Sequence, residues 1–225
     1  MHGLINRTIQ YFVQDIHGPD VWGDMARRLK LPEAGYDPSL AYDDAETFAL
    51  IDVAVARLHC PRHAFLHDLG QYLITSPAAD PLRRLLRVGG ATFIEALHAL
   101  DRMPARAALA LPDCALPPTV LTQQGPGRLR LVGRTARADY AHVLMGLIRA
   151  LAAQHDVGVD LDHARHGEII TIDVVVAEAE VPPRRPDDAG VAYGRVLAGT
   201  RGAGQALAGA SLIRAGGGQA TGATV

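Results

Sequence analysis

The chain has 225 residues, of which 48% are hydrophobic, so it is long enough to bury a substantial core. Its 22 basic and 24 acidic residues nearly balance, and this excludes the charge signature of a nucleic-acid or membrane-surface protein. There is no apolar run of the roughly 18 residues that a membrane span needs and no recognisable secretory leader, so we expect a cytoplasmic protein. Cys60 and Cys114 lack metal-type spacing and are expected to be reduced thiols.

Apolar residues recur at helical spacing from the start of the chain. A first helix is predicted over residues 4–17, where Gly18 and Pro19 end it, and a second, short helix follows to Lys30. The first helix is amphipathic, so its apolar face should be buried. That face carries Leu4, Ile5, Ile9, Phe12, Val13 and Ile16.

Further helices are predicted before any strand. The stretch 32–42 is rich in Pro, Gly and Asp and is predicted to be a loop, after which Asp43 or Asp44 can cap the next helix. Pro61 suits the first turn of another helix, and a shorter one ends at the glycine pair that begins at Gly89.

The stretch from Gly89 to Pro117 is predicted to be a central helix interrupted by Pro104. A proline inside a helix removes a backbone donor and crowds the carbonyl four residues back, so the helix must kink or restart there. Its apolar stripe is predicted to be buried and consists of Phe93, Ile94, Leu97 and Leu100.

The helical period is lost after Pro117, and two pairs of short alternating segments follow. The first hairpin comprises residues 119–122 and 128–131, the second 157–161 and 170–176, with a long helix over 140–151 between them. The predicted fold class is therefore α+β, with N-terminal helices followed by a four-stranded antiparallel sheet and one long helix inserted between two hairpins.

The composition changes at about residue 180, where Pro, Gly, Ala and Arg become dominant. Such a segment cannot bury enough apolar surface to offset the entropy lost when a chain is ordered. We therefore predict one domain over residues 1–180 and a mostly disordered tail over 181–225.

Several strings fall in the order and spacing of one family. They are HGLINRTIQYFVQDIHGPDVW at the start, AYDDAETFAL, the GG-x-x-F-x-x-x-L-x-x-L-D pattern of the central helix, and HVLMGLIRAL. Over about residues 1–180 the chain resembles the heme nitric oxide/oxygen-binding (H-NOX) domain, the sensor at the front of the soluble guanylate cyclase β subunit that also occurs as stand-alone bacterial proteins. The resemblance implies the same helices-then-sheet order.

The resemblance also implies a heme site in which one residue type has changed. In the family a histidine of the central helix holds the heme iron, and a Tyr-x-Ser-x-Arg motif binds the heme propionates. The histidine position falls on Pro104, which has no free lone-pair nitrogen. The propionate motif falls on Gly133, Thr135 and Arg137, and Asp44 matches the acidic partner of the arginine. A plain Arg137–Asp44 salt bridge is an equal alternative.

The resemblance places three apolar residues at the cofactor. Ile5 and Pro117 match positions that press against the porphyrin, with ordinary core packing as the alternative. Val143 matches the distal gas position, and its side chain offers bound oxygen no hydrogen bond, so nitric oxide is the favoured gas.

Other residues are candidate metal donors. His98 lies on the central helix about 9 Å along the axis from position 104 and about 120° round it, and a surface histidine is the favoured alternative. Met103, Cys114 and His142 are weaker candidates. The histidines at 59, 63 and 67 have partial zinc spacing, but a structural role is favoured because only one further acidic residue lies beside them in the sequence.

The leading hypothesis is a heme-binding-type sensor domain for nitric oxide or a related ligand, with a degenerate site, that signals to a separate protein. The alternative is a heme-free interaction or scaffold module on the same fold. No nucleophile triad, phosphate loop or paired acid–base site is recognisable, so we expect no enzyme activity.

Overall fold

The computed structural model describes residues 2–32, 34–110, 116–137 and 139–177. The predicted disordered tail lies outside the described residues, as does Cys114. Within this part of the chain, the first compact unit covers Met1–Ala179 and contains all of the helices and strands described below.

Four helices form the N-terminal half: α1 (Gly3–His17), α2 (Pro19–Leu29), α3 (Asp44–Leu58) and α4 (Arg62–Thr75). Of the two candidate caps for α3, Asp43 is the cap, because its carboxylate accepts a hydrogen bond from the backbone N–H of Ala45 at 2.9 Å. The prediction of a buried Ile16 was wrong, since this side chain is 59% exposed. Ile16 lies in the last turn of α1, beyond the part of that helix which packs into the core.

The central stretch divides at Arg102, two residues before Pro104, and restarts as a new helix, in agreement with the predicted interruption. After the 3₁₀ turn η1 (Pro77–Ala79) and helix α5 (Asp80–Leu86), helix α6 spans Phe93–Asp101 and a separate helix, α7, spans Met103–Ala110. Pro104 is the second residue of α7, where a missing N–H breaks no helical hydrogen bond. The prediction for Ile94 was wrong, because it is 42% exposed; it lies about 100° round the helix from Phe93.

The C-terminal half is a four-stranded antiparallel sheet with order β1-β2-β4-β3. Its strands are β1 (Thr119–Gly125), β2 (Arg128–Arg134), β3 (Val159–His166) and β4 (Ile169–Val176), and α8 (Tyr140–Gln154) connects the two hairpins. The predicted α+β class and the helix between two hairpins are therefore confirmed.

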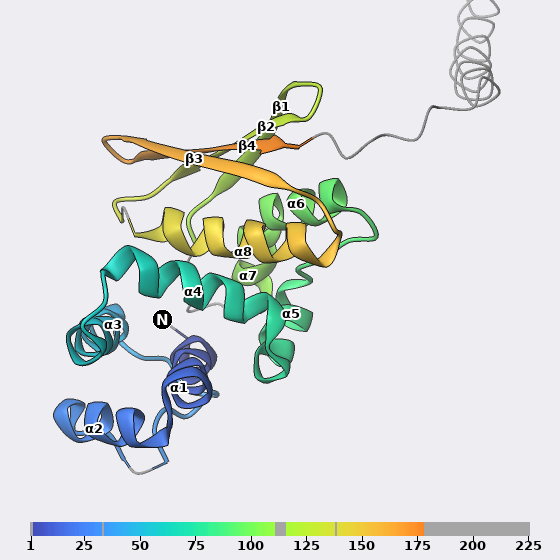
Figure 1. The fold of residues 1–225 in the computed structure, drawn as a ribbon. Coiled ribbons are helices and arrows are strands. Elements are labelled where there is room, and N and C mark those ends of the chain that lie inside the picture. The colour runs from blue at the N-terminus through green and yellow to red at the C-terminus, as the bar shows by residue number, and fades with distance from the viewer. Residues whose placement is uncertain (1, 33, 111–115, 138, 178–225) are drawn as a thin grey trace, which may run out of the picture. The chain divides into compact units, whose positions relative to one another are not determined.

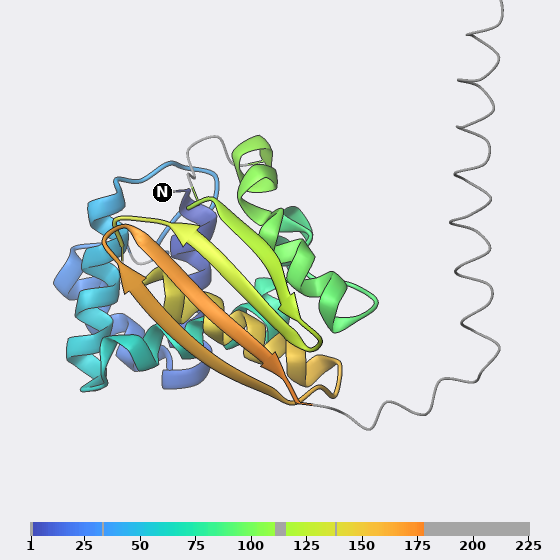
Figure 2. The ribbon, with the colours of Figure 1, turned by 90° about the horizontal axis from the view of Figure 1, so that it is seen from above.

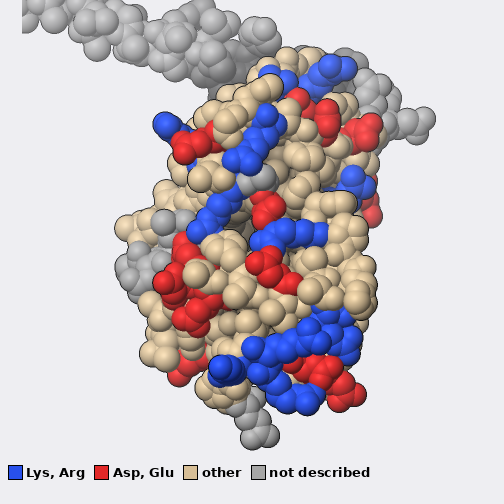
Figure 3. All heavy atoms as spheres, turned by 90° about the vertical axis from the view of Figure 1, so that its left-hand side faces the viewer, with Lys and Arg blue, Asp and Glu red and all other residues tan. Residues whose placement is uncertain are grey.

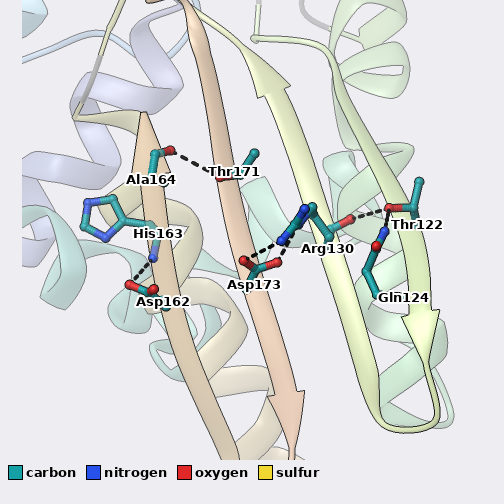
Figure 4. A network of polar contacts seen from close by, with 8 residues as sticks. All are labelled: Thr122, Gln124, Arg130, Asp162, His163, Ala164, Thr171 and Asp173. Carbon is teal, nitrogen blue, oxygen red and sulfur yellow. Dashed lines mark hydrogen bonds and ion pairs between the residues drawn. The ribbon is translucent and has the colours of Figure 1, made fainter. Parts of the chain in front are cut away.

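The two faces of the sheet differ in polarity. Leu131 pairs with Ile172 and Leu129 with Val174, and all four side chains are buried on the face that covers the core. On the opposite face the guanidinium of Arg130 donates to both carboxylate oxygens of Asp173 at 2.6 and 2.9 Å (Figure 4). This alternation is what the period of a half-buried strand requires.

The elements form successive layers beneath the sheet. Helix α8 lies directly under the sheet, α4 lies under α8, and α1, α2 and α3 lie beyond α4 (Figure 1). Seen from above, the sheet covers α8, with α6 and α7 beside it (Figure 2). Helices α4 and α8 cross at two glycines: a Cβ on Gly146 would meet the His67 carbonyl oxygen at 2.0 Å, and one on Gly70 the Val143 carbonyl oxygen at 2.2 Å. Only glycine permits this approach.

The apolar side chains form two clusters. One joins the sheet, α8 and helices α5–α7, and the other joins α1–α4. Ile5, Leu73 and Val143 pack against both clusters, so they mark the boundary at which the two meet.

Charged side chains on the face shown in Figure 3 are of both signs. Basic side chains gather at its lower end, over α2, with acidic side chains beside them (Figure 3). Both Arg27 and Arg57 form ion pairs with Asp24 in this region. None of the described helices combines the length and the apolar character needed to cross a membrane.

Candidate functional site

A cavity of about 410 Å³ lies between α1, α3, α4, α5, α7 and α8, at the boundary between the two apolar clusters. This volume is within the range of small-molecule and cofactor sites. Its walls are mainly aliphatic, with contributions from Leu66, Leu69, Leu73, Leu82, Leu86 and Leu147.

The structure brings every predicted cofactor-contacting residue to this cavity. They come from α1, α3, α8 and the two connections that flank β1 and β2, and they are Ile5, Asp44, Pro117, Thr135, Arg137 and Val143. Segments more than 100 residues apart in sequence thus meet at one site, as the family resemblance implied. Their contact with a bound cofactor stays a prediction.

Arg137 is one of the arginines that line the cavity, and it lies at the polar end. Its Nη2 donates to Asp44 Oδ2 at 3.0 Å, and its guanidinium carbon lies 3.6 Å from the ring centroid of Phe48. Asp44 and Phe48 are one turn apart on α3, so the same helix pairs with the guanidinium and stacks on it. The Arg137 side chain is 43% exposed, which leaves further N–H donors accessible to an anion.

Thr135 shapes the turn that presents Arg137. Its backbone N–H donates to the Glu168 carbonyl at 2.7 Å, and its Oγ1 accepts from the Arg137 backbone N–H at 3.0 Å. The side chain is buried. A hydroxyl that accepts one hydrogen bond can still donate another, so Thr135 both fixes the turn and keeps a donor for a ligand.

A second arginine lies at the same end. Arg62, the first residue of α4, donates through Nε to Asp139 Oδ2 at 2.6 Å and also forms an ion pair with Asp52. Both Arg62 and Asp139 line the cavity. This pair connects α4 to the residue before α8, so it fixes the two helices at the mouth of the site.

No histidine of the described residues lines the cavity. Pro104 is half-buried and does not line it, whereas its neighbour Met103 does. His98 is exposed on α6, so the structure does not bring it to the predicted site. Of the residue types that serve as axial ligands to heme iron, the described lining offers only the Met103 thioether and the Tyr140 phenol.

Three histidines gather outside the cavity, where α4, α8 and β3 meet. The ring centroids of His63 and His142 are 5.6 Å apart, and those of His142 and His163 are 4.9 Å apart. Burial and then the neighbouring imidazoles lower the pKa of His142 below its ordinary value of 6.5. Within the described part of the chain, no group of three or more His, Cys, Asp or Glu side chains has metal-binding geometry.

Sequence reasoning missed Phe48, Arg62 and Tyr140. Phe48 follows Asp44 by four residues and Tyr140 precedes Val143 by three, so helical spacing from a predicted site residue would have found both. Arg62 carried no such signal, because its partner Asp139 is 77 residues away in sequence.

Solved H-NOX structures share this fold. A mutant H-NOX protein from S. oneidensis in the Fe(II) ligation state has 15% sequence identity and a TM-score of 0.69, with 80% of this chain and 98% of that chain covered. An Fe(II) unliganded mutant from K. algicida has 19% identity and a TM-score of 0.67, covering 80% and 98%. The T. tengcongensis H-NOX I5F mutant has 13% identity and a TM-score of 0.68, covering 79% and 98%.

Identities this low show the fold alone, and the family is shown by the sequence itself. The family model described as HNOB, Haem-NO-binding, matches residues 2–163. That match begins at His2, immediately before α1, ends in β3 and includes every residue at the polar end of the cavity. This chain belongs to the Haem-NO-binding (H-NOX) family.

Proposed function

We propose that this domain is a ligand-occupancy sensor: a tetrapyrrole of the heme type binds in the cavity, and its presence is passed to a separate signalling protein. The observation that carries the proposal is an apolar cavity of about 410 Å³ with Arg137, Thr135 and Asp44 at one end. A tetrapyrrole that carries carboxylates needs this combination, an apolar space for the ring and a planar cation for the acid. The proposal assigns no catalytic reaction to the chain.

The described residues fit one part of heme and not another. The aliphatic walls and Arg137 suit the ring and the propionates. The described lining offers the iron no imidazole, since it contains no histidine, and the resemblance aligns Pro104 with the family's histidine position. We therefore place the signal in occupancy of the cavity. Nitric oxide sensing stays a prediction that depends on a restored iron ligand.

The presence of a ligand in the cavity can be transmitted to a partner through the elements that surround the cavity. Ile5, Leu73 and Val143 touch both apolar clusters, and Val143 also sits at the glycine crossing of α4 and α8. A ligand between the clusters changes the contacts of both, so its binding free energy can favour one relative position of these helices over another. We propose that the partner recognises that difference in a soluble, cytoplasmic complex.

The test is a titration of the purified full chain with hemin, followed by absorption spectroscopy. We expect one hemin per chain, with a Soret band shifted from that of free hemin. The second candidate function is a heme-free interaction module, which Pro104 favours because it removes the family's ligand. A chain that leaves the hemin spectrum unchanged at any concentration would support that scaffold role and reject the proposed sensor.

A further inference from the structure

The cavity lining is mainly aliphatic, carries arginine side chains and offers few groups that could bind iron. Both candidate donors to a metal are weak: Met103 is a neutral thioether, and Tyr140 must lose its phenolic proton to bind ferric iron. The anion-binding end carries the Arg137 guanidinium, which is paired with Asp44 and keeps further N–H donors accessible. A metal ion therefore adds little to what the described residues can bind.

The polar end is arranged for a carboxylate at the cavity mouth. The Phe48 ring stacks on one face of the Arg137 guanidinium, with 3.6 Å between the guanidinium carbon and the ring centroid. Asp44 accepts a hydrogen bond from the Nη2 nitrogen of this guanidinium. A second hollow of about 330 Å³ adjoins this point and is lined by Phe48, Ala136, Arg137 and Asp139. Arg137 lines both hollows, so an acid that reaches it stands at the boundary between the interior and the surface.

The interior behind Arg137 requires an apolar body. Two hydroxyls of the lining are already used within the protein, because Thr8 Oγ1 donates to the Leu4 carbonyl at 2.7 Å and Thr47 Oγ1 donates to Asn6 Oδ1 at 2.7 Å. A polar ligand would lose its hydration without gaining partners there. A hydrocarbon chain or an aromatic macrocycle would gain the burial of its whole surface.

From these three observations we infer that the cavity binds an apolar carboxylate through its acid and its hydrocarbon body, without coordination of a metal. This inference rests on the proposed function and names the chemistry of the occupant. Two sources supply it, a metal-free porphyrin and a long-chain fatty acid. Both place a carboxylate on Arg137 and apolar surface against the aliphatic walls.

The experiment compares three probes on the full chain: hemin, iron-free protoporphyrin IX and oleate. We expect the dissociation constants of hemin and protoporphyrin IX to agree within about threefold. If the iron forms no bond to the protein, the binding free energies of the two probes should differ by less than about 1 kcal/mol. Oleate that displaces protoporphyrin IX at micromolar concentration assigns the site to fatty acids. Binding of the porphyrin without displacement by oleate assigns it to tetrapyrroles.

The outcomes separate this inference from the proposed function. Hemin that binds more than about 100-fold tighter than protoporphyrin IX would overturn the inference and leave the sensor function standing. Oleate alone as a ligand would support the inference and reject the tetrapyrrole sensor. A chain that binds none of the three probes refutes both.

Variants locate any metal donor directly. We expect Met103→Leu, Tyr140→Phe and Cys114→Ser to leave the ratio of hemin to protoporphyrin IX affinity unchanged; Cys114 is included because it lies outside the described residues. Arg137→Gln should weaken both probes equally, by about 10-fold or more, with Arg134→Gln as the control. Arg134 is a comparable β2 arginine that pairs with Glu168 and does not line the cavity. A selective loss of hemin in any of the first three variants would contradict the inference.

Discussion

Arg137 and Thr135 lie two residues apart and contribute different kinds of contact to a bound acid. Arg137→Ala removes a charge-assisted, planar contact, worth about 1.5–3 kcal/mol or roughly 10–100-fold in affinity. Thr135→Ala removes one neutral hydroxyl and loosens the turn, so we expect a smaller loss. The measurement is porphyrin affinity by fluorescence titration, with Arg134→Ala as a matched control. Equal losses in the Arg137 and Thr135 variants would speak against a carboxylate clamp.

Pro104 is the residue that the sequence resemblance aligns with the histidine of the family. Pro104→His returns a backbone N–H at the start of α7 and an imidazole beside Met103, which lines the cavity. We expect the variant, reduced without oxygen, to give a five-coordinate histidine-type heme that binds nitric oxide. With Val143 at the predicted distal position, it should not hold oxygen stably.

The wild-type chain provides the comparison under identical conditions, and we expect it to show no histidine-type spectrum. Such a spectrum in the wild type would mean that a histidine outside the described lining reaches the iron. His98→Ala in both backgrounds would then test the exposed histidine of α6 directly.

His142 gives the fold a pH dependence. Its pKa is lowered in the folded chain, first by burial and then by the imidazoles of His163 and His63, while Asp139 acts in the opposite direction. The unfolded chain therefore binds more protons, and the stability contributed by neutral His142 is complete above pH 6.5 and is lost as pH falls through and below that value.

We expect the urea midpoint of the wild type to decrease as the pH is lowered from about 7 to about 5. His142→Gln should make this decrease smaller. His98→Gln, a change on the exposed face of α6, is the control. The same pH dependence of the urea midpoint in the His142 variant would show that other groups dominate it, such as His17, whose pKa is also lowered.

At the scale of elements, the crossing of α4 and α8 is a close contact between two helices that line the cavity. A methyl group on Gly146 would lie 2.0 Å from the His67 carbonyl oxygen, so Gly146→Ala must separate the helices, at a cost of about 1–3 kcal/mol in unfolding free energy. Gly23→Ala in α2 meets nothing within 4 Å and should instead stabilise by about 0.4–1 kcal/mol. In urea unfolding, the two variants should change the free energy of unfolding in opposite directions. No change for Gly146→Ala would show that the helix crossing can widen without cost.

Periodicity predicted the type and order of these elements because each has one apolar face. It did not predict how wide or how long a buried face is. Ile94 lies outside the buried face of α6 and Ile16 lies beyond the buried part of α1, so both predictions were wrong. The break at Pro104 was predictable because proline lacks an N–H. The stacking of Arg137 on Phe48 was not predictable, because it joins a turn to a distant helix. Asp44, the partner of Arg137 on that helix, lies 93 residues earlier in the sequence. The cavity itself was implied only by the family resemblance.

At the scale of the whole molecule, the described elements all fall within Met1–Ala179. The composition of residues 181–225 predicts a tail that adds little to any core. Truncation after residue 180 is therefore expected to change the melting temperature by less than about 2 °C, which for a domain of this size corresponds to under 1 kcal/mol. A decrease of several degrees in calorimetry would reject the predicted disorder.

The internal space at the boundary of the two apolar clusters has a mechanical consequence. Unfolding eliminates that void, so the unfolded chain occupies less volume than the folded one, and hydrostatic compression favours unfolding. A bound molecule fills the same space and removes this difference. The empty domain is then more compressible than the occupied one. A partner bound to the helices around the cavity would therefore contact a domain whose stiffness, as well as its shape, depends on occupancy.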